Sequence, residues 1–235
     1  MLRIVLFFFI IILATPISGQ QILISEDLRG DTMVPKFGMN RKNFGHFYSG
    51  FHGFAGSAES LADSLNYTTS WAFDCGYRYK RRFSQVLSAG IEWQIKRLSY
   101  STRQWDKLHT SAATKVDKQK LVFLQTGLSF YQRFNYDKRR GDYVGRYFDV
   151  GVYGDWSFNI RHEYFYRNRA GAKVRIRESG LDFIQPFEWG VLVRLGFNNV
   201  VLKTSYRFSD HFKETSGIGE FPRLTYGLEI GIFAF

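Results

Sequence analysis

The sequence predicts an all-β protein, an eight-stranded antiparallel transmembrane β-barrel with meander topology. Three observations predict it: an apolar/polar alternation that recurs in segment after segment, an apolar export signal, and an aromatic content of 18%, with 24 Phe and 14 Tyr. A period of two gives each strand one apolar and one polar face. The mean hydropathy of −0.24 is compatible with a barrel, because lumen-facing polar residues dilute each strand.

Residues 1–19 are predicted to be a secretory signal peptide. Arg3 supplies the positive n-region, residues 4–14 form the apolar h-region, and Gly19 is a small residue at a plausible cleavage point. A transmembrane anchor is the alternative, but the apolar run is shorter than the roughly 20 residues that a spanning helix needs. The signal directs the barrel to the bacterial outer membrane, where it is expected to be integral.

Residues 20–43 mix apolar and charged residues without a sustained period. We expect a periplasmic N-terminal extension there, and a disordered tail is the alternative. Residues 44–235 are predicted to form the barrel. Their alternating segments are 46–55, 69–80, 87–96, 120–134, 146–158, 187–197, 200–208 and 223–235.

The alternating segments differ in how clearly their sequence identifies the apolar face of the strand. In 46–55 aromatic residues fall on both parities, so neither face is identified. In 69–80 an apolar face that begins at Trp71 opposes a polar face, and the next five segments alternate in the same way. At the C-terminus, Phe233 and Phe235 share the parity of Glu229, so a bulge or an inward turn of both rings is required.

The connections provide an independent check. Four long ones are expected outside the cell: residues 56–68, 101–119, 159–186 and 209–222. Three shorter ones are expected in the periplasm: Lys80–Arg82, residues 135–145 and the tight turn Asn198-Asn199. This order places both termini in the periplasm. A soluble lipocalin-like cup is the alternative, but its interior would have to hold the wider aromatic face, and eight strands leave no room for that.

The polar faces predict a balanced charge network in the lumen. Six acids and six bases share the inward parity: Asp74, Glu92, Asp149, Asp155, Glu188, Glu229, Arg78, Lys96, Arg133, Arg194, Lys203 and Arg207. Buried charges must be paired, so we expect salt bridges that fill the lumen, with a transport path as the alternative. A barrel of this size, that of the small OmpA/OmpX-type barrels, is too narrow for an open pore.

The net charge is +11, and removal of Arg3 with the signal leaves +10, which must then lie on loops and termini. The loop 159–186 is rich in cations: Arg161, Arg167, Arg169, Lys173, Arg175 and Arg177. Lys173, Arg175 and Arg177 would lie on one face of a strand above the membrane. Arg and Lys suit phosphate, so lipopolysaccharide is the expected anion rather than nucleic acid. A solvated hairpin is an equal alternative.

The sequence contains only weak indications of catalytic or metal-binding residues. Asp210-His211 and His162-Glu163 are adjacent acid–His pairs, but neighbours on a strand point to opposite faces. No Ser lies in a recognisable nucleophile motif, and no metal-ligand spacing or phosphate loop is present, so no catalytic residue, metal or cofactor is predicted. The single Cys75 excludes an intramolecular disulfide and is expected to face lipid.

Five stretches resemble the PorT-like outer-membrane β-barrel proteins of Bacteroidota. They are Tyr77–Phe83, Phe148–Trp156, Ser179–Phe187, Tyr206–Phe212 and Pro222–Ile232. The resemblance implies a barrel over about residues 44–235 and, through one secretion-associated member, a role in protein secretion. Fold alone does not confer function.

Three hypotheses follow. The first is a non-enzymatic barrel with a structural role in the envelope, or a subunit of an outer-membrane assembly with outer-membrane or periplasmic protein partners. The second is an adhesion or protective barrel that contacts lipopolysaccharide through Arg167, Arg169, Lys173, Arg175 and Arg177. The third is a small barrel hydrolase centred on His211 or His162.

Overall fold

The computed structural model describes residues 38–56, 65–102, 116–137, 143–167, 172–213 and 219–233. All of the described residues belong to one compact unit, Phe37–Phe235. The predicted signal peptide and most of the predicted N-terminal extension lie outside the described residues, as do Arg169 and Phe235.

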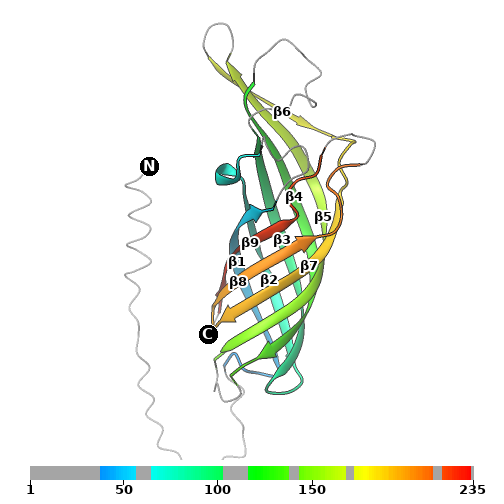
Figure 1. Ribbon diagram of the computed structural model, residues 1–235. Coiled ribbons are helices and arrows are strands. Elements are labelled where there is room, and N and C mark those ends of the chain that lie inside the picture. Colours follow the sequence, from blue (N-terminus) through cyan, green and yellow to red (C-terminus); the bar gives the residue numbers. More distant parts are fainter. Residues whose placement is uncertain are drawn as a thin grey trace, which may run out of the picture. The chain divides into compact units, whose positions relative to one another are not determined.

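Nine strands and a short 3-10 helix, η2 (Tyr67–Thr69), form the described part of the chain (Figure 1). The strands are β1 (Asn43–Ala55), β2 (Trp71–Arg82), β3 (Leu87–Thr102), β4 (Val116–Asn135), β5 (Arg146–Arg167), β6 (Lys173–Ser179), β7 (Phe187–Phe197), β8 (Val200–Arg207) and β9 (Leu224–Ile232). No helix among the described residues is both long enough and apolar enough to span a membrane.

Eight of these strands close into a barrel. Their order is β4-β3-β2-β1-β9-β8-β7-β5, a β4–β5 pairing closes the ring, and each pairing is antiparallel. The predicted eight-stranded antiparallel meander is therefore confirmed. Because the number of strands is even, β1 begins and β9 ends at one end, where Phe47 pairs with Ile232. We call this the turn end and the opposite one the loop end.

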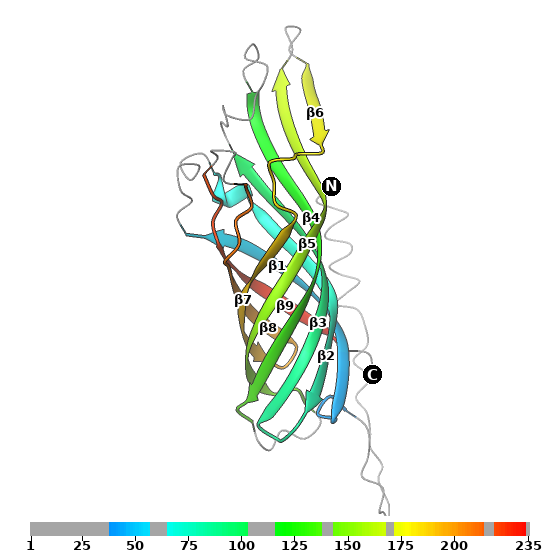
Figure 2. The same cartoon turned by 90° about the vertical axis from the view of Figure 1, so that its right-hand side faces the viewer.

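The remaining strand, β6, lies outside the ring. Among the described residues it pairs with β5 alone. The prediction that residues 159–186 form one loop was wrong in extent, because β5 continues to Arg167 before β6 begins. Figures 1 and 2 show β4, β5 and β6 projecting beyond the other strands at the loop end. A register shift between β4 and β5 interrupts the parity of β5, so the alternation that marks its barrel part does not continue unbroken here.

At the turn end, one predicted turn differs from the structure and another agrees with it. The predicted Lys80–Arg82 turn was wrong, because β2 runs to Arg82 and the chain turns at residues 83–86, where the amides of Phe83 and Ser84 donate to the Leu87 carbonyl at 3.0 Å. In the predicted tight turn between β7 and β8, Asn198 has a φ of 59°, which Asn tolerates.

Outward side chains form an apolar belt with aromatic girdles toward both ends. Toward the loop end the exposed rings include Phe51, Trp156, Phe158, Phe187 and Trp189, and toward the turn end they include Phe83, Tyr136, Tyr143 and Phe197. Such a belt is what a barrel shows to lipid. β1, whose faces the sequence left open, turns Phe47 and Phe51 outward and Tyr48 and His52 inward. The chain is a small membrane barrel of the outer-membrane type.

Inward tyrosines fit the narrow lumen because glycines lie opposite them. Tyr131 pairs with Gly90, and Tyr147 pairs with Gly196. A Cβ on Gly196 would lie 2.0 Å from the Tyr147 ring, and one on Gly90 would lie 2.4 Å from the Tyr131 ring. The interior therefore accepts more aromatic residues than its strand number suggests, provided that the facing residue has no side chain.

Apolar clusters close both ends of the lumen. At the loop end the cluster includes Phe54, Tyr100 and Phe123 from strands with Phe212 and Phe221 from the β8–β9 connection. At the turn end Phe233 packs against Phe44, with ring centroids 5.9 Å apart. Of the two alternatives for the C-terminus, an inward turn is the one that Phe233 adopts.

Candidate functional site

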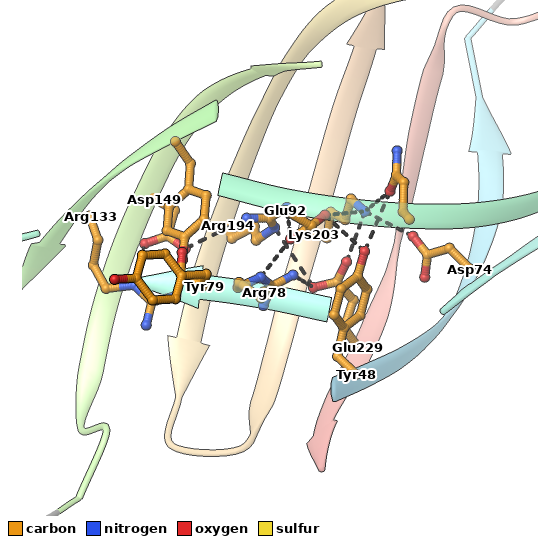
Figure 3. A network of polar contacts seen from close by, with 12 residues as sticks. Tyr48, Asp74, Arg78, Tyr79, Glu92, Arg133, Asp149, Arg194, Lys203 and Glu229 are labelled. Carbon is orange, nitrogen blue, oxygen red and sulfur yellow. Dashed lines mark hydrogen bonds and ion pairs between the residues drawn. The ribbon is translucent and has the colours of Figure 1, made fainter. Parts of the chain in front are cut away.

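Glu92 of β3 is the centre of the buried charge network (Figure 3). Its Oε2 accepts hydrogen bonds from Arg78 Nε and from Arg194 Nη2, both at 2.6 Å, and its Oε1 accepts one from the Tyr48 hydroxyl at 2.8 Å. The three charged side chains have no exposed surface. Strands β1, β2, β3 and β7 are thus joined across the lumen by one carboxylate.

Lys203 of β8 extends this network to β2 and β9. Its Nζ lies 2.8 Å from both Asp74 Oδ2 and Glu229 Oε1, while Arg78 Nη2 donates to Glu229 Oε2 at 2.7 Å. The hub then holds three acids, Asp74, Glu92 and Glu229, and three bases, Arg78, Arg194 and Lys203. Its formal charge is zero, which is the condition for burying so many ions.

Smaller groups fill the lumen on either side of the hub. Arg133 donates two hydrogen bonds to Asp149, at 2.7 and 2.8 Å, and its guanidinium lies 3.4 Å from the Tyr147 ring centroid. On the loop side Lys96 pairs with Asp155. Arg207 Nη2 contacts Glu220 at 2.8 Å, and Arg207 Nε lies 3.9 Å from Glu188.

The structure places all twelve predicted lumen residues on the inward face. Gln94 and Gln125 lie on the inward parity that the alternation predicts, whereas sequence reasoning missed three inward polar residues that lie in β1 or at a strand end: His46, His52 and Lys80. A cavity of about 30 Å³ lies between the hub and the loop end, beside His52 and Lys96. The cavity is large enough for water, which needs roughly 10–15 Å³, whereas Arg78, Glu92 and Arg194 in the hub have no exposed surface.

His52, Asp74 and Glu229 are the one described group with the ligand types of a metal site, with ligand atoms within 4.8 Å of one another. They come together because Gly50 pairs with both Asp74 and Glu229 and has no side chain between them. However, the Lys203 ammonium already contacts both carboxylates. A divalent ion would add two charges to a neutral buried group, so the donor set does not fit a resident metal.

His211 lies in the mouth of the barrel with no exposed surface. Its Nδ1 is 3.2 Å from Glu188 Oε1, and its Nε2 is 3.1 Å from the Tyr100 hydroxyl. The acid partner is thus Glu188 of β7, whereas the adjacent Asp210 contacts Arg223.

His162, the other histidine of the hydrolase hypothesis, is buried as well. Its contacts include Gln119 at 3.3 Å and Glu178 at 3.7 Å. His109 lies outside the described residues. The acidic partners described for the two histidines of this hypothesis, Glu188 and Glu178, come from other strands rather than from the adjacent Asp210 and Glu163.

Glu220 ties the β8–β9 connection into the mouth. Its carboxylate accepts hydrogen bonds from the His211 amide at 2.9 Å and from Arg207 at 2.8 Å. Burial acts to raise the pKa of Glu220, but its interactions with His211 and Arg207 outweigh it and hold that pKa below its usual value.

The outward face of the projecting sheet is basic, and we call it the outer basic face. Directly paired residues share a face, and the pairs Val122–Arg161, Lys120–Glu163, Glu163–Arg177 and Phe165–Arg175 build its rows. Its described cations are Arg97, Lys118, Lys120, Arg161, Lys173, Arg175 and Arg177, against the single acid Glu163. Burial and neighbouring Lys118 lower the pKa of Lys120, as expected where cations crowd together.

Two of the five predicted anion contacts already have a partner. Glu163 lies 2.6 Å from Arg175 and 3.4 Å from Arg177, which the sequence analysis did not anticipate. Lys173 is exposed at the start of β6. Arg169 and the side chain of Arg167 lie outside the described residues. Sequence reasoning missed Arg97, Lys118 and Lys120, which come from β3 and β4.

No protein-family model matches this chain, and no curated protein matches it. Solved structures do, among them two of Ail, the attachment invasion locus protein of Yersinia pestis. The one in complex with the heparin analogue sucrose octasulfate is 11% identical, with a TM-score of 0.34 over 80% of this chain and 95% of that chain. The other is 12% identical, with a TM-score of 0.35 over 81% and 97%. At this identity and TM-score the likeness extends to the barrel fold alone.

Proposed function

We propose that this protein is a non-enzymatic outer-membrane barrel with a role in the envelope, and that its outer basic face contacts the phosphates of lipopolysaccharide. One observation carries the proposal: the cations continue the outward face of the same strands that carry the lipid-facing belt. On β3, Arg97 follows Ile95 and Trp93 on that face, so it lies about 7 Å along the strand from the belt. The filled lumen supports a structural role rather than a transport role.

This proposal assigns the loop end to the outside of the cell, and the turn end with both termini of the barrel to the periplasm. The long connections and the projecting sheet at the loop end support this orientation. In an outer membrane the polyanion nearest to such a face is lipopolysaccharide, and Lys and Arg both bind phosphate.

The test measures binding of labelled lipopolysaccharide to the barrel in phosphatidylcholine nanodiscs at increasing salt. A triple variant, Lys118→Gln, Lys120→Gln and Lys173→Gln, removes three cations without breaking a described ion pair. We expect binding of the unaltered protein to weaken with salt and the variant to bind about tenfold more weakly.

A matched control removes the same charge at the turn end, through Arg41→Gln, Lys42→Gln and Arg81→Gln. It should bind like the unaltered protein. Salt-independent binding, or an equal loss in both triple variants, would contradict the proposal.

A role as a subunit of an outer-membrane assembly, which the PorT-like resemblance implies, is a second candidate. The edge position of β6 favours it, because only one side of β6 is paired among the described residues, and an open edge accepts another strand. The charges on Lys173, Arg175 and Arg177 limit unselective pairing. Purification from the native membrane in mild detergent, with mass spectrometry, should find a stoichiometric protein partner, and a barrel without one would exclude this role.

A further inference from the structure

The outer basic face contains a hollow of about 70 Å³, lined by Arg97, Val122, Leu124, Asn159, Arg161 and Glu163. Its floor is apolar and comes from β4. Leu124 pairs with Arg97 on β3 and with Asn159 on β5, while Val122 pairs with Arg161. Two guanidinium groups therefore flank an apolar floor at the loop-end margin of the belt.

A β-bulge creates this arrangement. The pairing shifts so that Gln125 faces Ser157 while Leu124 faces Asn159, which leaves Phe158 as an extra residue. Before the bulge the even-numbered residues of β5, such as Trp156, face outward. Beyond it the odd-numbered residues do, because His162 lies inward and buried. Without the bulge Arg161 would point toward the lumen.

The carboxylate in the hollow does not neutralise these two arginines. Glu163 is engaged by Arg175 and Arg177. Arg161 Nε instead donates to the Asn159 side-chain carbonyl at 2.8 Å, and the Arg97 guanidinium lies 5.5 Å from the Trp71 ring centroid. Neither Arg97 nor Arg161 forms a described ion pair, so each retains donors for an anion while a neutral neighbour positions it.

We propose that this hollow is a phosphate subsite, in which Arg97 and Arg161 hold the phosphate monoester of a membrane lipid while its apolar part lies over Leu124 and the belt. The proposal rests on the proposed function, because it locates the contact within the outer basic face. Guanidinium groups bind phosphate oxygens through paired hydrogen bonds. The apolar floor favours an amphiphile over a free phosphate ion.

The test uses the full barrel in a phosphate-free detergent. The probes are short-chain phosphatidic acid, short-chain phosphatidylcholine and inorganic phosphate. Binding is followed by calorimetry and by the NMR resonances of the Arg Nε–H groups. We expect phosphatidic acid to bind more tightly than the other two probes and to shift the resonances of Arg97 and Arg161.

Arg97→Gln and Arg161→Gln should each weaken phosphatidic acid binding at least tenfold, and Arg161→Lys should restore less than full affinity, since Lys lacks the fork of donors. The matched control, Arg81→Gln, removes one exposed charge at the turn end and should change binding less than twofold. All variants are first checked for folding by the heat-modifiable mobility of the barrel.

The possible outcomes distinguish the phosphate subsite from the proposed contact with lipopolysaccharide. If the unaltered protein binds lipopolysaccharide with salt sensitivity but both glutamine variants bind phosphatidic acid normally, the subsite is overturned and the function stands. If phosphatidic acid requires both arginines but lipopolysaccharide does not bind, the function is overturned and the subsite stands. Equal affinity for inorganic phosphate would overturn the assignment to a lipid.

Discussion

Replacing Glu92 with Gln tests the most consequential feature of the lumen, the sharing of one carboxylate by Arg78 and Arg194. Gln keeps the shape and the hydrogen bond to Tyr48 but removes the charge that balances the two guanidiniums at 2.6 Å. Removing one partner from a buried ion pair costs about 3–5 kcal/mol, because the remaining charge is left uncompensated in a low-dielectric site. We therefore expect Glu92→Gln to lower the free energy of unfolding by about 4 kcal/mol.

The assay is urea unfolding of the barrel in detergent, followed by tryptophan fluorescence and by gel mobility. With a urea dependence of about 2 kcal/mol per molar, the midpoint should fall by about 2 M. Asp137→Asn is the matched control, because its partner Arg146 is 66% exposed at the turn end, and no measurable shift is expected. A double variant, Glu92→Gln with Arg194→Met, should recover part of the loss because it restores charge balance.

A shift in Glu92→Gln as small as that in Asp137→Asn would refute the reasoning. It would mean that water solvates Arg78 and Arg194 once the carboxylate is gone. The hub would then be a hydrated network, and the argument that the lumen is filled and closed would fail with it.

Three further predictions concern other parts of the molecule. Gly196→Ala should cost about 1–3 kcal/mol in the same assay, since the Tyr147 ring cannot move away from Arg133, whereas Gly53→Ala, with its nearest contact at 3.4 Å, should cost little. Because the pKa of Glu220 is lowered in the folded state, its stabilising effect is present above its ordinary pKa and is lost as the pH falls through the lowered value. Hydrogen-exchange protection of the His211 amide, which donates to Glu220, should therefore be lost only at pH values below the ordinary Glu pKa of about 4.3 and should be independent of pH in Glu220→Gln. Cys75, exposed on the outward face of β2, should react with an apolar maleimide but not with a charged one in liposomes, and labelling by both would place it outside the lipid.

The alternation was sufficient to predict the ring of eight strands and the inward parity of the twelve charged residues, because each depends on a local period of two. It could not give the partners of those charges. Glu92 and Arg194 are 102 residues apart and meet only through the closure of the barrel. Similarly, Glu188 reaches His211 from another strand, whereas the sequence drew attention to the adjacent Asp210.

The outer basic face was only partly predictable because of the bulge at Phe158. A parity count that continues from Trp156 puts Arg161 and Glu163 in the lumen, and nothing in the local sequence marks the extra residue. Arg97 and Lys120 are distant from β6 in sequence and join it only through the pairing of β3, β4, β5 and β6. Likewise, Gly196 could not be identified as the residue opposite Tyr147 until the register of β5 against β7 was known.

The hub and the outer basic face differ in how well they tolerate amino-acid substitutions. A single substitution in the hub leaves a buried ion without its partner, so the lumen charges can change only together. On the outer basic face each cation is exposed or half-exposed, so that one can be lost or gained at little cost to stability. Binding specificity can therefore vary on the outer face while the barrel beneath it remains folded. The surplus positive charge agrees with this division, because the hub is neutral and the outer face is one of the described regions where unpaired cations gather.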